Sequence, residues 1–212
     1  MTNEQVVFFK DKFNVSRETI DKLNIYLDFL IYSNKYLNLI GKTTEKTIFF
    51  RHFTDSAQIY DLIDNKNNII DIGSGAGFPG FILKLLLDDK KIKCNVELIE
   101  KSPKKCKFLV ELNKKLNMDI KIVNIRLEDY KFKNMNVVVS RAFKKTSETL
   151  AILLKNKNLI KDIILLKGKN YQLELDEAIK KYSFSFEKFQ SITSQEGKII
   201  KINNIQPIVV NA

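Results

Sequence analysis

A glycine-rich segment is the first stretch of the chain whose residue types indicate chemistry. Residues Ile69 to Gly80 read IIDIGSGAGFPG, with an apolar run at the start and Pro79 near the end. Glycine adopts positive φ readily, and its lack of a Cβ lets a ligand approach the backbone. A helix that begins at Pro79 directs free N–H groups toward such a ligand. The segment is therefore typical of a strand, turn and helix that bind a nucleotide-like cofactor.

The carboxylate of Asp71 distinguishes between two such cofactors. Gly75, Gly77 and Gly80 satisfy the spacing GxGxxG, which also occurs in nicotinamide-dependent dehydrogenases. An acidic side chain two residues before Gly73 would repel a pyrophosphate, whereas it would stabilise the ammonium and sulfonium groups of S-adenosylmethionine. The segment favours an S-adenosylmethionine-dependent methyltransferase, and a dehydrogenase is the alternative.

Two acidic positions farther along extend the expected cofactor site. Glu100 lies 23 residues beyond Gly77, close to the spacing at which an acidic residue receives ribose hydroxyls; a solvated acid beside Lys101 is the alternative. Glu128 follows the third expected strand, where it or its backbone would meet the adenine edge, the alternative being a simple loop acid. The expected cofactor-binding residues are Asp71, Gly73, Ser74, Gly75, Gly77, Phe78, Glu100, Lys101, Leu127, Glu128 and Arg141.

Amphipathic periodicity near the N-terminus predicts a helical cap over residues 1–65. Apolar residues recur at three- and four-residue steps after Ser16, which can cap the first long helix. The cap would pack on the part of the chain that carries the glycine turn. The expected helical segments are Ser16 to Leu39, a segment capped by Thr43 or Thr44 that runs to Phe50, and Asp55 to Ile63.

Residues 66–212 alternate between short apolar runs and helical stretches, as expected of a parallel sheet wrapped by helices. The pattern predicts an α/β fold, Rossmann-like and doubly wound, with a mostly parallel sheet of about seven strands and an antiparallel edge. The expected strands are Asn68 to Ile72, Val96 to Ile99, Ile120 to Val123, Val137 to Ser140, Ile163 to Leu166, Phe184 to Ile192 and Lys198 to Ile205. The expected helices are Pro79 to Leu87, Pro103 to Leu116, Ser147 to Lys155 and Glu174 to Tyr182.

The composition indicates a globular protein with a polyanionic partner. The 212 residues are 44% hydrophobic and 29% charged, which argues against disorder, and the formal charge of +11 would attract RNA. Only four of the 36 basic residues are arginine, so part of the excess reflects a lysine-rich composition. The sequence contains no signal-peptide pattern and no apolar run of about 18 residues, and Cys94 and Cys106 lack metal-ligand spacing. We expect a cytoplasmic protein with neither a membrane nor a metal as partner.

Several motifs, taken in order, resemble the bacterial 16S ribosomal RNA N7-guanine methyltransferases, also called the RsmG or glucose-inhibited division protein B family. The resemblance covers most of the chain, and the blocks RHFTDS and SRAF are more specific than the glycine turn. The chain departs from many relatives by carrying Glu100 in place of Asp, and the lysine-rich region after Gly168 leaves the RNA-docking surface open. The matching segments are Asn38 to Ile40, Arg51 to Ser56, Asp71 to Gly80, Glu100 to Leu109, Arg126 to Asp129, Ser140 to Phe143 and Leu166 to Gly168.

The resemblance implies an S-adenosylmethionine-dependent methyltransferase that acts on one guanine of 16S ribosomal RNA within the small ribosomal subunit. It also implies that Arg51, His52, Arg141 and Lys167 line the active cleft. Phe143, beside Arg141, is the candidate for stacking on a base. We expect a monomer. A methyltransferase for another RNA or a protein, and a non-catalytic RNA-binding module, are the alternatives.

Methyl transfer to guanine N7 requires little acid–base catalysis from the protein. N7 presents an unprotonated lone pair, so in-line transfer requires neither a general base nor a metal, and positioning can supply about 7 to 11 kcal/mol. An arginine forked onto O6 and N7 would block the reacting atom, so Arg141 is expected to grip a phosphate or O6 from one side. Arg51 and Lys167 are expected to bind the RNA backbone or the cofactor carboxylate. Asp55, one helical turn beyond His52, is expected to orient the imidazole.

Overall fold

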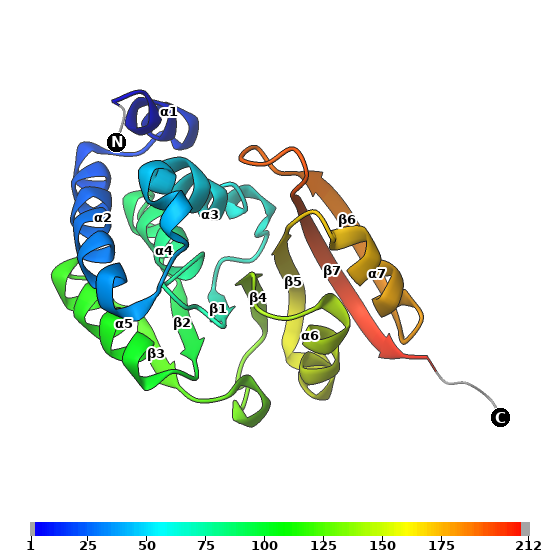
Figure 1. The fold of residues 1–212 in the computed structure, drawn as a ribbon. Coiled ribbons are helices and arrows are strands. Elements are labelled where there is room, and N and C mark those ends of the chain that lie inside the picture. Colours follow the sequence, from blue (N-terminus) through cyan, green and yellow to red (C-terminus); the bar gives the residue numbers. More distant parts are fainter. Residues whose placement is uncertain (1–2, 209–212) are drawn as a thin grey trace.

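A computed structural model describes residues 3–208, and these residues form one seven-stranded sheet (Figure 1). The strand order is β3-β2-β1-β4-β5-β7-β6; β7 runs antiparallel to β5 and β6, and the other neighbouring pairs are parallel. The predicted fold class and its antiparallel edge are confirmed, with β7 placed between β5 and β6. The strands are β1 (Asn68–Ile72), β2 (Asn95–Glu100), β3 (Lys121–Asn124), β4 (Asn136–Arg141), β5 (Ile160–Lys167), β6 (Tyr182–Gln190) and β7 (Lys198–Pro207).

Alternate residues of the strands face two separate hydrophobic clusters, which is the period of two expected of strands buried on both faces. In β4, Val137 and Val139 belong to the cluster that contains the buried side chains of α2, α4 and α5, whereas Val138 belongs to the cluster of α6 and α7. Helices therefore cover both faces of the sheet (Figure 1). Within residues 3–208, no helix is long and apolar enough to cross a membrane. The α-helices are α1 (Asn3–Phe13), α2 (Arg17–Leu37), α3 (Asp55–Ala57), α4 (Gly80–Asp89), α5 (Pro103–Lys115), α6 (Thr146–Leu153) and α7 (Tyr171–Ile179).

The strand order reverses direction at β1 and β4, and this position determines where a ligand can bind. From β1 the chain proceeds outward to β2 and β3, then returns to pair β4 with the other side of β1. In open α/β sheets the crevice lies at the carboxyl ends of the strands where the order reverses. Asp71 of β1 is in register with Val139 of β4. The glycine turn after β1 and Arg141 at the end of β4 therefore lie at the same edge of the sheet.

The N-terminal region is less regular than the sequence predicted. Helix α1 was not expected. The helix predicted from Thr43 or Thr44 to Phe50 is wrong in type, and of the helix predicted over Asp55 to Ile63 only the first turn, α3, is α-helical. Aromatic and β-branched residues are frequent in this stretch and disfavour a regular α-helix, while burial of Phe49 and Phe53 holds it compact. The short non-α or mixed segments of the described chain are the 3₁₀ turn η1 (Lys42–Thr47), the π-helical turn η2 (Phe49–Thr54), and the 3₁₀ turns η3 (Tyr60–Leu62), η4 (Leu127–Asp129) and η5 (Leu154–Leu159).

Tyr26 joins the N-terminal helices to the glycine turn. Its side chain, on α2, is completely buried, and its hydroxyl donates a hydrogen bond to the carbonyl of Ala76 at 2.5 Å. Its ring stacks on Phe78 with the centroids 5.4 Å apart. A Cβ at Gly77 would lie 2.8 Å from the Tyr26 hydroxyl, so this contact also requires glycine. The helices within residues 3–65 thus share one hydrophobic cluster with the sheet, and a domain boundary at residue 65 stays a prediction.

Tyr26→Phe should lower the free energy of unfolding by about 1 to 3 kcal/mol, because the carbonyl of Ala76 would lose its donor inside the core. Urea unfolding followed by circular dichroism measures this change. Tyr32→Phe is the matched control, since Tyr32 is 60% exposed. Equal stability of the two variants would contradict a structural role for the Tyr26 hydroxyl.

Candidate active site

Asp71 lies beneath the glycine turn. It is completely buried, and its Oδ2 accepts a hydrogen bond from the backbone N–H of Gly80 at 3.0 Å, at the start of α4. Its Oδ1 is buried and has no hydrogen-bond partner among the residues that the structure describes. Burial raises the pKa of Asp71 to about 7, although the hydrogen bond from the N–H of Gly80 opposes this shift. From the sequence, this carboxylate was expected beside the positive groups of the cofactor. In the structure it is buried and hydrogen-bonded to the start of α4. Direct contact between Asp71 and a cofactor therefore stays a prediction.

Glu100, at the end of β2, holds the glycine turn from the side. Its Oε2 accepts from the N–H of Gly75 at 3.0 Å, and its Oε1 accepts from the N–H of Ser102 at 2.8 Å. The side chain is almost buried. An ionised carboxylate can accept about four hydrogen bonds, so the two backbone bonds leave capacity for ligand hydroxyls. Glu100 is therefore fixed in the wall of the site. The alternative considered from the sequence, a freely solvated acid, is wrong.

A cavity of about 360 Å³ lies beside Glu100. The cavity is the size of a small cofactor site. Among the sequence-predicted cofactor residues, Gly73, Glu100, Lys101, Leu127 and Glu128 line it, whereas the remaining members of that set do not. Ser74 and Phe78 are buried within the turn, where they support its shape. The full lining is Gly73, Ile99, Glu100, Lys101, Lys105, Ile125, Arg126, Leu127, Glu128, Ala142, Phe143 and Lys144.

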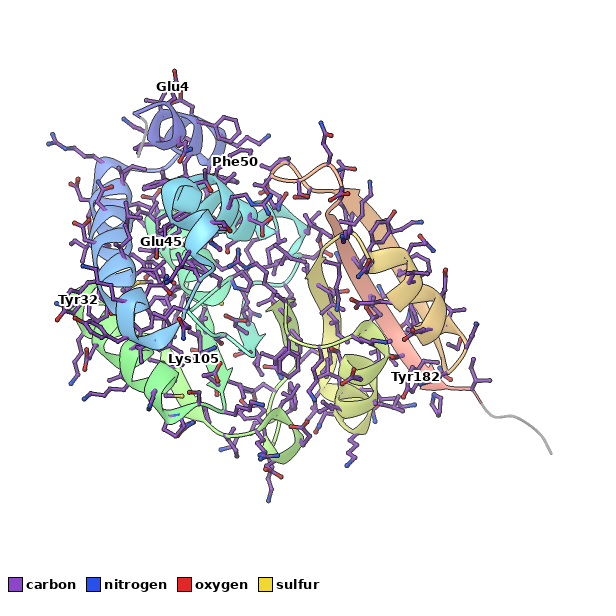
Figure 2. All side chains as sticks on the ribbon, viewed as in Figure 1. Glu4, Tyr32, Glu45, Phe50, Lys105 and Tyr182 are labelled. Carbon is purple, nitrogen blue, oxygen red and sulfur yellow. The ribbon has the colours of Figure 1, made fainter. Side chains whose placement is uncertain are left out.

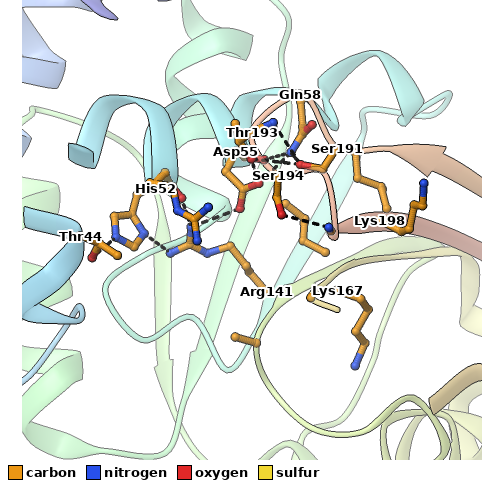
Figure 3. A pocket seen from close by; sticks show the side chains of 16 residues that line it. Thr44, His52, Asp55, Gln58, Arg141, Lys167, Ser191, Thr193, Ser194 and Lys198 are labelled. Atoms are coloured by element: carbon orange, nitrogen blue, oxygen red, sulfur yellow. Dashed lines mark hydrogen bonds and ion pairs between the residues drawn. The ribbon is translucent and has the colours of Figure 1, made fainter. Parts of the chain in front are cut away.

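A second cavity of about 310 Å³ adjoins the first at Ala142, which lines both. All four residues predicted to form the catalytic cleft line this cavity: Arg51, His52, Arg141 and Lys167. The N-terminal region contributes two of them through η2, and the ends of β4 and β5 contribute the others. Figure 3 shows these side chains together with polar residues of the β6–β7 loop. The structure thus brings together residues more than 100 positions apart in the sequence.

The guanidinium of Arg141 is held at three points. One Nη2–H donates to Nδ1 of His52 at 2.6 Å, and Nη1 donates to the carbonyl of Arg51 at 3.1 Å and to Oδ2 of Asp55 at 3.4 Å. The guanidinium carbon also lies 4.7 Å from the centroid of the Phe78 ring, a cation–π distance. Three of the five guanidinium N–H donors are used in these bonds, and two are left for a ligand. The side chain is 17% exposed, so a ligand in the second cavity can reach it.

The contact with Arg141 fixes the protonation state of His52. Because the guanidinium is always charged and can only donate, Nδ1 of His52 must accept, and Nε2–H then donates to Oγ1 of Thr44 at 2.9 Å. Burial, together with the positive charges of Arg141 and Arg51, lowers the pKa of His52 to about 3. The imidazole also stacks on Phe78, with the centroids 5.3 Å apart. His52 is therefore a neutral hydrogen-bond acceptor that orients Arg141.

Asp55 has partners that the sequence argument did not anticipate. It was expected to orient the imidazole of His52, and instead Oδ2 pairs with Arg141 while Oδ1 accepts from Thr193 Oγ1 at 2.5 Å and from Gln58 Nε2 at 2.8 Å. Thr193 lies in the loop between β6 and β7. One carboxylate of α3 thus connects the N-terminal region with β4 and with the β6–β7 loop (Figure 3). No local signal marks Thr193 or Gln58, because their importance arises only from the tertiary contact.

Lys167 lines the second cavity, but its ammonium group points away from the network around Arg141 (Figure 3). Its Nζ donates to the carbonyl of Lys144 at 2.6 Å and to Oε2 of Glu174 at 2.8 Å, and the side chain is only 8% exposed. Binding an RNA phosphate would require this ammonium group to leave Glu174. In this arrangement Lys167 braces the segment after β4.

That segment passes directly over the glycine turn. Ala142 has a φ of +53°, a conformation that costs energy for a residue with a Cβ and that is found at functional sites. The ring of Phe143 then lies against Gly73: a Cβ at Gly73 would come within 2.2 Å of Phe143 Cδ2. Gly73 itself has a φ of +67°. Position 73 therefore requires glycine, both because its φ is positive and because a Cβ would clash with Phe143. Phe143 itself forms one wall of the first cavity.

Comparison with solved structures places the fold among methyltransferases. A putative S-adenosyl-L-methionine-dependent methyltransferase from Methanococcus maripaludis matches with a TM-score of 0.53 at 16% identity, over 79% of this chain and 92% of that protein. The TrmK protein of M. capricolum, solved with the cofactor product S-adenosyl-homocysteine, matches with a TM-score of 0.50 at 18% identity, over 70% of this chain and 66% of that one. These likenesses concern the fold alone.

Sequence comparison adds the family. The chain matches a family model described as GidB, rRNA small subunit methyltransferase G, over residues 19–203. It is 39% identical over 196 residues to the ribosomal RNA small subunit methyltransferase G of Rickettsia felis, an alignment that covers 92% of this chain and 98% of the relative. With the match spanning the sheet, both cavities and most of the N-terminal helices, the chain belongs to the rRNA small subunit methyltransferase G family of S-adenosylmethionine-dependent enzymes.

Proposed function

We propose that this enzyme methylates N7 of one guanine of 16S rRNA in the assembled small ribosomal subunit. The observation that carries the proposal is the junction of two cavities at Ala142, with the cofactor residue Glu100 on one side and the fixed guanidinium of Arg141 on the other. The family's rRNA substrate limits the choice of methyl acceptor. We further propose that the enzyme works as a monomer in the cytoplasm, where that subunit is assembled in bacteria.

The first cavity fits S-adenosylmethionine by its chemistry. Glu100 offers carboxylate oxygens for ribose hydroxyls, while Ile99 and Leu127 offer apolar surface for a purine ring. Glycine at position 73 keeps the backbone open where a side chain would meet Phe143. When bound, S-adenosylmethionine supplies a methyl group activated by a sulfonium. Glu128, which pairs with Lys144 at 3.6 Å, lies at the rim, where its backbone is the proposed adenine contact.

The second cavity supports binding of the acceptor guanine. Arg141 retains two donors and is fixed by His52, Arg51 and Asp55, so it can hold a phosphate or guanine O6 at a defined position. A guanidinium directed at N7 itself would block the reacting lone pair. Phe143, which follows Ala142 in the chain and lines the first cavity, is the proposed stacking partner of the flipped base.

This arrangement needs no general base. Guanine N7 has no proton to remove, and the Nδ1 lone pair of His52 is already engaged by Arg141. The methyl transfer is therefore assigned to positioning, with Arg141 as the clamp and with His52 and Asp55 as positioning residues. Two residues predicted as catalytic have lesser parts in the proposal: Lys167 braces Lys144, and Arg51 contributes a backbone carbonyl and a charge at the cavity rim.

Methyl transfer from labelled S-adenosylmethionine to small subunits that lack the native modification tests the proposed function. Digestion of the product RNA to nucleosides, followed by mass spectrometry, should show 7-methylguanosine at one site per subunit. Naked 16S RNA and bulk protein, run in parallel, distinguish the acceptors. Label in protein, or in a nucleoside other than 7-methylguanosine, would overturn the proposal.

Arg141→Ala should reduce kcat by at least about 100-fold, the scale of losing one fixed electrostatic donor, while the cofactor Kd stays within about twofold. Arg141→Lys should also be impaired, because lysine keeps the charge but loses the fork. Arg17→Ala, an exposed arginine at the start of α2, is the control and should be unaffected. Unchanged turnover of Arg141→Ala would remove Arg141 from the mechanism.

Glu100→Gln should weaken S-adenosylmethionine binding by roughly 10-fold or more, because the amide nitrogen cannot accept from backbone N–H groups and the turn loses a charged acceptor. Isothermal titration calorimetry measures the Kd. Glu97→Gln, on the same strand but paired with Lys121 at the surface, is the control. Cofactor affinity that is insensitive to Glu100→Gln would leave the first cavity without its proposed role.

The low pKa of His52 predicts a pH dependence of stability. The imidazole is neutral in the folded protein down to about pH 3, but in the unfolded chain it takes up a proton below its ordinary pKa of 6.5. The unfolded state therefore binds more protons between these values, and the unfolding free energy falls as pH is lowered through this window, by up to about 1.4 kcal/mol per pH unit. Urea unfolding between pH 7 and 4 should show a shallower pH slope for His52→Gln than for the unaltered protein, and identical slopes would contradict a buried neutral imidazole.

A further inference from the structure

Helices α2 and α5 lie side by side (Figure 1). Two exposed tyrosines of α2 lie on this part of the surface, and neither lines either of the two cavities. Tyr36 is 73% exposed and Tyr32 is 60% exposed, and their rings meet edge to face with the centroids 6.0 Å apart. Figure 2 shows Tyr32 at the outer edge of the molecule. Large exposed aromatic groups that lie together are uncommon on a soluble protein and mark interaction sites. The exposure of these two tyrosines therefore indicates that they contact a binding partner.

The same surface has a preformed hollow of about 270 Å³. Beside the tyrosines, its walls include Phe29 and Phe108, whose rings stack in parallel planes at 5.1 Å and 8°. The ammonium group of Lys115 lies 5.1 Å from the centroid of Phe29. Because Phe108 is only 2% exposed and stacks on Phe29, the aromatic rings most open to a flat conjugated ligand are those of Tyr32 and Tyr36.

The lining of the hollow carries two lysines and one acidic residue. Lys104 and Lys107, both exposed on the first turns of α5, line it, with Glu111 as the acidic residue of the lining. On the same helix and just before it, Lys101 and Lys105 line the cofactor cavity. Lysines on α5 or just before it therefore line both the cofactor cavity and the aromatic hollow, and with the chain's formal charge of +11 they favour attraction of a polyanion.

We propose that this surface, formed by α2 and α5, binds a single-stranded segment of the rRNA substrate outside the active site. Unpaired bases stack on Tyr32 and Tyr36, and the adjoining phosphates pair with Lys104 and Lys107. Proteins that bind single-stranded RNA combine aromatic side chains, on which unpaired bases stack, with basic side chains that pair with phosphates. In a double helix the bases are already stacked on one another, so only the lysines would contribute to binding. The inference rests on the RNA substrate of the family and assigns the docking surface that the sequence left open.

A two-point attachment follows from this assignment. The aromatic surface holds the RNA, and the second cavity holds the reacting base through Arg141. Loss of the surface should therefore raise KM for RNA without changing the chemistry, while loss of Arg141 should lower kcat. The two parts of the account are thus separable by experiment.

The test uses the full-length variant Tyr32→Ala/Tyr36→Ala, whose side chains are exposed, with urea unfolding as the check on folding. The KM for unmodified small subunits should rise by at least about 10-fold, the scale of losing stacking on two bases, with kcat and the cofactor Kd unchanged. Binding of a fluorescent single-stranded oligoribonucleotide, measured by anisotropy, should weaken by a similar factor. Tyr32→Phe/Tyr36→Phe should restore both quantities, because stacking does not need the hydroxyl.

The lysines are tested by the salt dependence of the same oligoribonucleotide binding. Lys104→Gln/Lys107→Gln should reduce the slope of log K against log salt by about 1.4, since each phosphate contact to a single strand contributes about 0.7. Lys180→Gln/Lys181→Gln, exposed lysines beside β6 on the other side of the molecule, are the matched control and should leave the slope unchanged. Unaltered KM and oligoribonucleotide binding in the tyrosine variant would overturn the proposal. A raised KM for subunits with unaltered oligoribonucleotide binding would also overturn it, by assigning the surface to a ribosomal protein.

Discussion

The hydrogen bond between the Arg141 guanidinium and Nδ1 of His52 is the contact on which the arrangement of the site depends. Arg141 extends from the end of β4, whereas His52 belongs to the π-helical turn η2, so this bond joins the sheet to the N-terminal helices. A charged donor so poorly exposed to solvent requires fixed acceptors, and His52, Asp55 and the carbonyl of Arg51 provide them. Because Asp55 also holds Thr193, the position of Arg141 is linked to the hairpin that forms another wall of the second cavity.

The same principle shapes the cofactor side. An irregular glycine turn leaves backbone N–H groups without helical or sheet partners, and buried acids satisfy two of them: Asp71 at Gly80 and Glu100 at Gly75. Tyr26 satisfies the carbonyl of Ala76 from the opposite side. The turn is thus held from three directions before any ligand binds, which lowers the ordering cost of binding.

The parts of this account that the sequence predicted are those with a local or periodic signature. Short apolar runs between helical stretches identified the strands, and the family resemblance implied the four cleft residues Arg51, His52, Arg141 and Lys167, all of which line one cavity. Their partners were not predictable, because Asp55 turns toward Arg141 and Lys167 toward Glu174 only after tertiary packing. After residue 42, 3₁₀ and π-helical turns stand where one helix was expected, and a second expected helix is shortened to α3. Burial of aromatic side chains favours this arrangement, which propensity alone does not encode.

The tautomer of His52 is the most direct test of the central claim, that a neutral imidazole accepts a hydrogen bond from Arg141. The chain contains a single histidine, so long-range ¹H–¹⁵N correlation spectra of the labelled protein report on that ring alone. The account predicts a proton on Nε2, none on Nδ1, and no titration between pH 8 and 5. A proton on Nδ1, or titration near pH 6.5, would show that Arg141 does not donate to His52 in solution and would contradict the account.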